Sequence, residues 1–194
     1  MDIKAGRPNV GVNPNKVAKR AKGYEHILIV MRHAKAEPFG AEGDYGRELT
    51  PKGLKQAKKV AKGLAEMKLV PDAIACSAAT RARQTLGKML KTFGDKPKVD
   101  YHQSLYDGGV QAVFDELTHV KDKARVLMVL GHEPTVSIAS QWLASSESDP
   151  ERLDLLNLGL QTAGVVIFGS DKPFKQWQVH SGDLLAVMSS SDFD

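Results

Sequence analysis

Short apolar segments alternate along this chain with longer segments in which apolar residues recur every three or four positions. The segment HILIVM at residues 26–31 is rich in β-branched side chains and bounded by polar residues, which is typical of a strand buried on both faces. A helix is predicted for residues 51–68, where Thr50 can cap the first turn and Pro51 can occupy the first helical position. Its apolar positions repeat at helical spacing, with lysines on the other side: Leu54, Ala57, Ala61, Leu64 and Ala65.

The rest of the pattern continues this alternation. Strands are predicted at 71–77, 97–102 and 125–131, helices at 78–93, 108–120 and 135–144, a loop or irregular helix at 145–160, and a closing pair of strands at 162–170 and 174–180. This order predicts an α/β fold of three layers, with a mostly parallel central sheet, helices on both faces and an antiparallel edge. In such sheets, ligands bind at the carboxyl ends of the strands.

The composition is that of one globular domain. Of 194 residues, 42% are hydrophobic and 26% are charged, so we expect a single domain over residues 25–188 with Trp142 and Trp177 in its core. A flexible basic tail is expected at 1–24 and a flexible end at 189–194. Residues 1–25 carry six basic and two acidic side chains, which accounts for the whole net charge of +4. The neutral remainder argues against a nucleic-acid surface on the domain.

Cysteine content and hydropathy bear on the compartment. Cys76 is the only cysteine, which excludes an internal disulfide and a multi-thiolate metal site, and we expect it to be a buried strand residue. No apolar run approaches the roughly 18 residues of a membrane span, and the first residues lack the apolar segment of a secretory signal. A cytoplasmic protein without a membrane partner is expected.

Unusual side chains follow three of the predicted strands. Arg32 and His33 end the first strand, Arg81 lies in the first turn of the helix after 71–77, and His132 follows the strand 125–131. Two arginines and two histidines meeting at one rim, close to helix N-termini, suit a dianionic phosphate. No carboxylate cluster accompanies them, so neither a metal nor another cofactor is expected.

These motifs resemble those of a known family. The segments LIVMRHAKAE, DYGRELTPKGLKQA, ACSAATRARQT and LGHEP are similar to those of the histidine phosphatase superfamily, and most closely to its small SixA-type phosphohistidine phosphatases. The resemblance covers residues 27 to 180 and implies a phosphoglycerate-mutase-like fold. One departure is Ala34, which stands where a glycine usually follows the Arg-His pair.

The resemblance implies roles for the residues at the rim. His33 would be the nucleophile and would form a phosphohistidine intermediate, while Arg32, Arg81 and His132 would bind the phosphate oxygens. Phosphoryl transfer needs positioning and charge neutralisation, which forked arginines supply without a metal. For attack, one ring nitrogen of His33 must be unprotonated, and the other should donate to a fixed acceptor such as a backbone carbonyl.

The general acid is less well defined. Larger members of the superfamily use a carboxylate acid, and the stretch SLYDGG offers Asp107 only by loose alignment. The imidazole of a phosphohistidine leaves with less help than an alkoxide does, so a weak or absent acid favours an N–P substrate. Asp44 and Arg47, in the glycine-rich loop, are candidates for substrate contact, with a salt bridge within the loop as the alternative.

Competing motifs are incomplete. The spacing from Cys76 to Arg81 is C-x4-R rather than the C-x5-R of cysteine phosphatases, and Val136 replaces the second histidine of a zinc motif H-E-x-x-H. No Walker loop is present. The remaining histidines are expected to be structural or on the surface: His26, His102, His119 and His180.

The sequence therefore predicts a metal-independent phosphatase that acts through phospho-His33, preferentially on phosphohistidine in a protein partner, and that is a monomer. Two alternatives remain open at this point. One is a small-molecule phosphomonoesterase of the same superfamily, and the other is a non-catalytic phosphate-binding adaptor whose basic tail recruits a partner.

Overall fold

The central feature of the computed structural model, which describes residues 11–193, is a six-stranded sheet in the order β3-β2-β4-β1-β5-β6. Strands β1 to β4 are mutually parallel, whereas β5 runs antiparallel to both of its neighbours. The predicted three-layer, mostly parallel α/β fold is confirmed, but the antiparallel strand lies inside the sheet and not at its edge. The strands are β1 (His26–Arg32), β2 (Ala73–Ser77), β3 (Lys98–His102), β4 (Val126–Gly131), β5 (Val165–Ser170) and β6 (Asp183–Met188).

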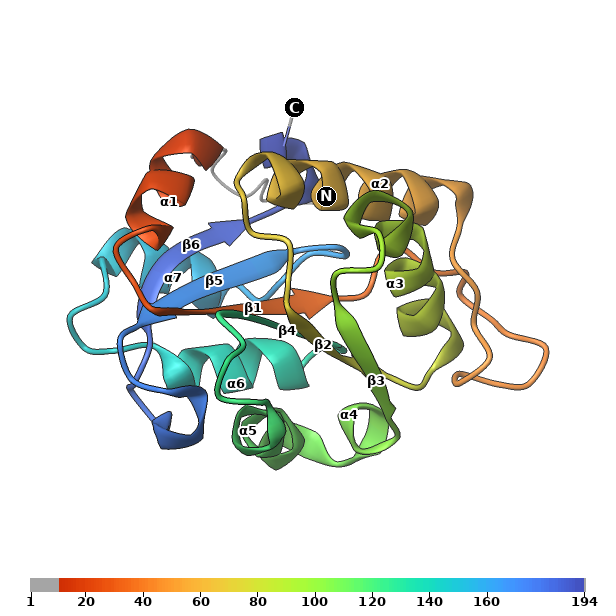
Figure 1. Cartoon of the computed structure of the whole chain (residues 1–194). Coiled ribbons are helices and arrows are strands. Elements are labelled where there is room, and N and C mark those ends of the chain that lie inside the picture. Colours follow the sequence, from red (N-terminus) through yellow and green to blue (C-terminus); the bar gives the residue numbers. More distant parts are fainter. Residues whose placement is uncertain (1–10, 194) are drawn as a thin grey trace, which may run out of the picture.

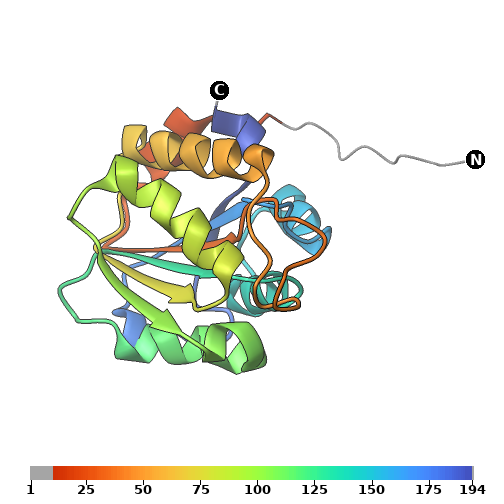
Figure 2. The ribbon, with the colours of Figure 1, turned by 90° about the vertical axis from the view of Figure 1, so that its right-hand side faces the viewer.

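Helices cover both faces of this sheet, as Figures 1 and 2 show. One face packs against α1 (Pro14–Ala21), α2 (Pro51–Glu66) and α3 (Thr80–Phe93), with the 3-10 helix η2 (Ser190–Phe193) beside α2. The other face packs against four helices and the 3-10 helix η1 (Phe174–Gln176). These four are α4 (Ser104–Asp107), α5 (Gly109–His119), α6 (Thr135–Leu143) and α7 (Pro150–Asn157).

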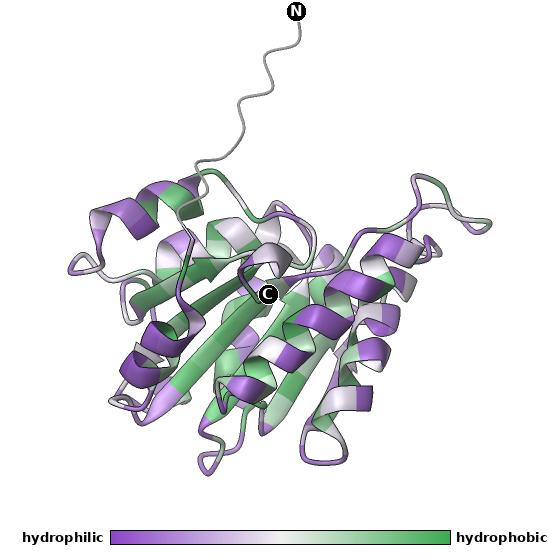
Figure 3. Ribbon diagram, turned by 90° about the horizontal axis from the view of Figure 1, so that it is seen from above, coloured by the Kyte–Doolittle hydropathy of each residue, from purple (hydrophilic) through white to green (hydrophobic). Residues whose placement is uncertain are grey.

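The strand β1 shows why this arrangement is stable. Its residues alternate between the two apolar clusters, with Ile27, Ile29 and Met31 on one face and Leu28 and Val30 on the other, and all five are fully buried. Figure 3 shows the consequence: the central strands are largely apolar, and the helices above them turn their polar residues outwards. The buried middle of β1 is apolar, and Arg32 places a polar group at its end, on the sheet's carboxyl edge.

Both chain ends differ from the sequence prediction. The expected flexible tail contains helix α1, which is capped by the Asn13 side chain and buries Val17 and Ala21 against the domain. The expected flexible end contains η2, and a Cβ on Gly63 of α2 would collide with the Phe193 ring. Apolar contacts to the domain therefore order segments whose local composition is polar. Residues 1–10 and 194 lie outside the described residues.

Of the two strands predicted to close the fold, only the first is present at the predicted position. β5 is present, but residues 174–176 form η1, and the partner of β5 is β6 at residues 183–188, a strand that was not predicted. Trp177 is buried as expected, because its ring lies against Phe174 and its indole nitrogen donates to the Lys172 carbonyl. Trp142 is 50% exposed, which contradicts the prediction that it belongs to the core.

The predicted helix start at Thr50 and Pro51 is confirmed, and it is joined to the loop after β1. The Thr50 hydroxyl accepts from Gly53 N, while Thr50 also donates from its backbone N–H and its hydroxyl to the Lys35 carbonyl. A Cβ at Gly53 would collide with that same carbonyl. The first turn of α2 therefore holds the segment that immediately follows His33. The helix ends at Glu66, two residues earlier than predicted, and Leu54 is 39% exposed although its spacing suggested burial.

Candidate active site

His33, directly after β1, is held in a single orientation. Its ring nitrogen Nδ1 lies 2.7 Å from the Ala34 carbonyl oxygen. A backbone carbonyl acceptor was predicted from the sequence, but its residue was not. A carbonyl only accepts, so Nδ1 carries the proton and Nε2 keeps a lone pair. The Ala34 backbone is itself fixed, because its N–H donates to the Thr85 hydroxyl at 3.0 Å. The geometry therefore makes Nε2, and not Nδ1, the candidate nucleophile.

The environment keeps this ring neutral. His33 is 6% exposed, and burial lowers its pKa to about 3, with smaller contributions in the same direction from His132, Arg81 and Arg32. The hydrogen bond to Ala34 acts in the opposite direction but does not outweigh burial. The imidazole is therefore unprotonated throughout the neutral pH range.

Arg81 connects His33 to the glycine-rich loop. Its Nε donates to His33 Nε2 at 3.1 Å, while Nη1 and Nη2 donate to the backbone carbonyl and side chain of Asp44 at 2.7 and 3.1 Å. The Asp44 carboxylate also accepts from Arg47 at 2.9 Å and from the Tyr106 hydroxyl at 3.0 Å. The hydrogen bond with Arg47, with smaller contributions from those with Tyr106 and Arg81, lowers the pKa of Asp44 to about 2. Three of the five donor hydrogens of Arg81 are used here, so two are available for a ligand.

His132 faces His33 from the end of β4. The two ring centroids are 5.2 Å apart, and His132 Nε2 lies 2.7 Å from the Ser77 hydroxyl at the end of β2. His132 is 7% exposed, and burial lowers its pKa to about 4, helped by the Arg81 charge. Its Nδ1 is buried and has no hydrogen-bond partner. The predicted meeting of His132 with His33 and Arg81 at one rim is therefore present.

Arg32 is positioned by the loop before β5. Its Nη1 donates to the Leu160 carbonyl at 2.8 Å, and its buried Nε has no partner. The Leu160 N–H is in turn shared between the Glu133 carboxylate at 3.2 Å and the Ser137 hydroxyl at 3.0 Å. Glu133 and Ser137 thus fix the loop that orients Arg32, which leaves its Nε free to bind a ligand oxygen.

Comparison with known proteins agrees with this geometry. The model of the family described as histidine phosphatase superfamily (branch 1) matches residues 28–107, which include Arg32, His33 and Arg81. An uncharacterized protein of Mycobacterium tuberculosis is 36% identical over 138 residues, which span 71% of this chain and 85% of that protein. The chain belongs to the histidine phosphatase superfamily. It is therefore a phosphatase of that superfamily.

Solved structures of other superfamily proteins have the same fold. A SixA-type protein from Nakamurella multipartitia is similar with a TM-score of 0.73 and 28% identity, covering 84% of this chain and 95% of that one. The protein histidine phosphatase SixA, complexed with tungstate, is similar with a TM-score of 0.71 and 21% identity, covering 87% and 99% of the two chains. The SixA-type resemblance and the phosphoglycerate-mutase-like fold expected from the sequence are confirmed.

The remaining residues predicted for this histidine phosphatase site lie at its periphery. Asp44 and Arg47 form the salt bridge within the loop that was the alternative to substrate contact, and Asp44 also binds Arg81. Asp107, at the end of α4, is exposed and accepts from Gln103 at 3.0 Å. Cys76 is buried as predicted, and burial raises its pKa to about 12. No group of three or more metal-ligating side chains occurs between residues 11 and 193.

Several residues of the site were not found by sequence reasoning. Tyr106 lies edge-on to His132 at 5.5 Å and binds Asp44 with its hydroxyl. Ser77 and Glu133 lie within the segments ACSAATRARQT and LGHEP, so membership of a motif was the available signal for both. Tyr106 contacts Asp44, 62 positions earlier, as well as Arg81 and His132, and no local pattern reveals such long-range contacts.

We expect Ser77→Ala to lower kcat/KM about tenfold, because the Ser77 hydroxyl is the partner that orients the His132 ring. As Ser77 acts through His132, the acid limb of the pH profile should also shift. Ser140→Ala is the matched control, since Ser140 is equally buried but binds the Val136 carbonyl within α6. An unchanged pH profile in Ser77→Ala would contradict the positioning role.

The two buried histidines should make folding stability depend on pH. Both folded pKa values, about 3 and about 4, lie below the value of about 6.5 in the unfolded chain. As the pH falls below 6.5, the unfolded state binds protons first, so stability is lost progressively until the folded pKa values are reached. We expect about 2 kcal/mol per ring to be lost between pH 7.5 and 5, measured by urea unfolding. His132→Gln should reduce this dependence, and an equal dependence in both proteins would refute its origin.

Proposed function

We propose that this protein removes phosphoryl groups in two steps through phospho-His33, and that its substrate is phosphohistidine in a protein partner. The observation that carries the proposal is the tautomer of His33. Its Nδ1 is committed to the Ala34 carbonyl, and its Nε2 lone pair points to a guanidinium that can also hold a phosphate. A domain that only bound phosphate would need the arginines but not an oriented, neutral imidazole, which argues against the adaptor alternative.

In the first step, Nε2 of His33 attacks phosphorus, a bond from phosphorus to Nε2 forms, and the bond from phosphorus to the leaving group breaks. In the second step, water attacks the phosphohistidine, which releases inorganic phosphate and restores the neutral ring. The roles proposed for Arg32, Arg81 and His132 are to bind the phosphate oxygens in both steps. Charge neutralisation by fixed donors is what the loose transition state of phosphoryl transfer requires.

The proposed substrate class rests on the leaving group. The Asp107 carboxylate is exposed and accepts from Gln103 at 3.0 Å, so its hydrogen bond is to a surface side chain and not to His33 or His132. An imidazole leaving group needs less protonation than an alkoxide, so a site with a weak acid favours an N–P bond. The likeness to the protein histidine phosphatase SixA supports the same class.

An exposed aromatic side chain beside the site supports a macromolecular partner. Phe39 is 85% exposed on the loop that also supplies Asp44, the residue that binds Arg81. Exposed aromatic side chains are enriched where proteins dock.

The second candidate, a small-molecule phosphomonoesterase, is favoured by the presence of Asp107 in α4, next to Tyr106. Among residues 11–193, no helix is both long and apolar enough to span a membrane. The cytoplasmic location and the monomeric state stay predictions from the sequence.

The intermediate provides the direct test. Incubation with a labelled phosphodonor, followed by rapid quenching, should yield a protein label that is stable in base and labile in acid, and that maps to the peptide containing His33. Turnover without any such label, under quench conditions that preserve a control phosphohistidine protein, would contradict the proposed two-step route.

Substitution of Asp107 separates the two candidate substrates. We expect Asp107→Asn to lower the rate on a phosphohistidine protein by less than about threefold, because the leaving imidazole needs little acid help. The same variant should be compared on p-nitrophenyl phosphate and on an alkyl phosphate. An equal, severe loss on the alkyl phosphate and on the phosphohistidine protein would show that Asp107 is a general acid for both and would favour the phosphomonoesterase reading. Asp115→Asn is a suitable control, because Asp115 is likewise an exposed carboxylate that accepts from a glutamine, Gln111.

A further inference from the structure

A second basic cavity lies at the opposite edge of the sheet from His33. It is lined by the start of β2 at Ala73, the start of β3 at Lys98 and the turn before β4 at Ala124. Because β2, β3 and β4 are parallel, their first residues meet at the edge that is remote from Arg32 and His33. The cavity has a volume of about 360 Å³, which is within the range of small-molecule sites.

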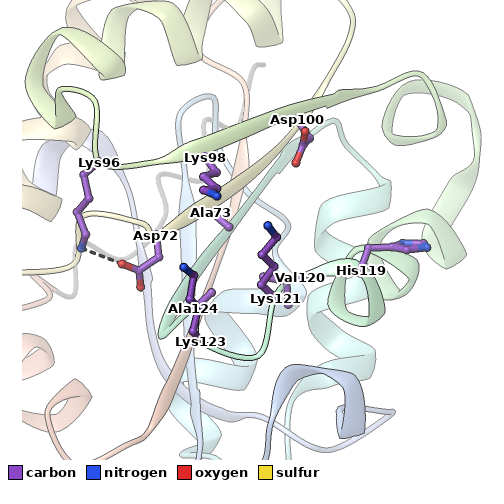
Figure 4. A pocket seen from close by; sticks show the side chains of 10 residues that line it. All are labelled: Asp72, Ala73, Lys96, Lys98, Asp100, His119, Val120, Lys121, Lys123 and Ala124. Atoms are coloured by element: carbon purple, nitrogen blue, oxygen red, sulfur yellow. Dashed lines mark ion pairs between the residues drawn. The ribbon is translucent and has the colours of Figure 1, made fainter.

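Lysines dominate the charge of this cavity. Four of them line it, against two aspartates, and Figure 4 shows Lys98 on one side and Lys121 and Lys123 on the other, with their side chains directed into the same hollow. Lys98, Lys121 and Lys123 are exposed, and no ion pair within residues 11–193 neutralises any of the three. Ammonium groups gathered in this way repel one another, so an anion between them would relieve that repulsion.

One of the two carboxylates that line the cavity, that of Asp72, is already engaged. Asp72 accepts from the backbone N–H groups of Arg125 and Val126, each at 2.9 Å, and forms an ion pair with Lys96 at 3.1 Å. These bonds tie Asp72 to the start of β4 and to Lys96, and they leave it unavailable to Lys98, Lys121 or Lys123. The cavity therefore has positive charge in excess of what its own acids balance.

The remaining wall indicates the size and character of a ligand. Ala73, Val120 and Ala124 give the cavity an apolar part beside the lysines, and His119 lies at its margin with its ring turned away from them (Figure 4). A single phosphate ion would fill only a small part of this volume. A ligand with several phosphate groups and an apolar or aromatic portion would contact both the ammonium groups and the apolar wall.

We propose that this cavity, bounded by Lys98, Lys121 and Lys123, is a binding site for a small organic polyphosphate of nucleoside di- or triphosphate size. The site is separate from the catalytic histidine, so its occupancy does not depend on the proposed phosphatase reaction. Two sources share the chemistry, an inorganic oligophosphate chain and a nucleotide that carries one, and the experiment below distinguishes them.

The test is a titration of the full chain, followed by amide chemical shifts, with three probes in the absence of divalent cations. The probes are adenosine 5′-(β,γ-imido)triphosphate, inorganic tripolyphosphate and adenosine. We expect saturable shifts at Lys98, Val120 and Lys121 with the first probe, distinct from any at Gly131 and His132. If tripolyphosphate binds as tightly as the nucleotide analogue, the phosphates alone are recognised. If it binds more weakly, the apolar wall contributes to the affinity for the nucleotide. Either result supports the site.

Matched double variants make the result specific. Lys98→Ala/Lys121→Ala should weaken binding at this site at least about tenfold, because two of the three converging charges are lost. Lys58→Ala/Lys62→Ala removes the same charge from exposed positions on α2 and should leave the affinity unchanged within about twofold. Absence of saturable shifts at millimolar probe, adenosine binding as tightly as its triphosphate analogue, or equal losses in the two double variants would each overturn the proposal.

Discussion

His33→Ala is expected to lower kcat by about 10⁴-fold or more while leaving phosphate binding nearly intact. The loss is large because, in the proposed route, Nε2 of His33 is the atom that forms the covalent bond with phosphorus. Binding should persist, because Arg32 and Arg81 keep their own anchors, the Leu160 carbonyl and the Asp44 loop. The measurement is steady-state kinetics on a phosphohistidine protein, with inorganic phosphate binding followed by calorimetry.

The matched control is His180→Asn. His180 is exposed, its ring Nδ1 donates to the Ala144 carbonyl at 2.9 Å, and its backbone φ of 62° is one that asparagine tolerates. This variant should retain wild-type kcat. If His33→Ala reduced kcat only about tenfold, direct attack by water would be the better account of the reaction.

Arg81→Ala is the second substitution with a large expected effect. We expect kcat/KM to fall by about 10³-fold, because this guanidinium donates to Nε2 of His33, the proposed nucleophile, and has two further donors for a phosphate. Its removal would also release the loop at Asp44, which Arg81 holds through the carbonyl and the carboxylate. Binding and chemistry should therefore both suffer, in contrast to His33→Ala.

Arg81→Lys should recover little of this loss. A single ammonium cannot reproduce the planar fork that contacts His33, the Asp44 carbonyl and the Asp44 carboxylate at once. Arg83→Ala is the control on the same helix, since Arg83 is exposed and its guanidinium lies over the Tyr101 ring at 4.3 Å. Equal losses in Arg83→Ala, or full recovery in Arg81→Lys, would show that overall positive charge and not geometry governs the rate.

The places where sequence prediction was wrong have a common cause. Residues 14–21 are polar in composition, yet Val17 and Ala21 find an apolar surface on the domain that orders them as α1. β6, the partner of β5, is separated from it by the 3-10 helix η1 and a loop. The pattern at 174–180 therefore led to a wrong predicted position for the last strand. In each case the decisive contact is with a distant part of the chain, and local periodicity carries no information about it.

What the sequence determined by itself was the alternation of strands and helices, and with it the position of each strand end. Parallel strands bring their carboxyl ends to one edge, so Arg32, His33, Arg81 and His132 had to lie near one another once the order of elements was known. The tertiary structure alone decided the ring tautomer of His33, through the Ala34 carbonyl, and the clamp of Asp44 on Arg81. The physical reason is range: periodicity follows from local backbone geometry, whereas a hydrogen bond depends on how distant segments pack to within tenths of an ångström.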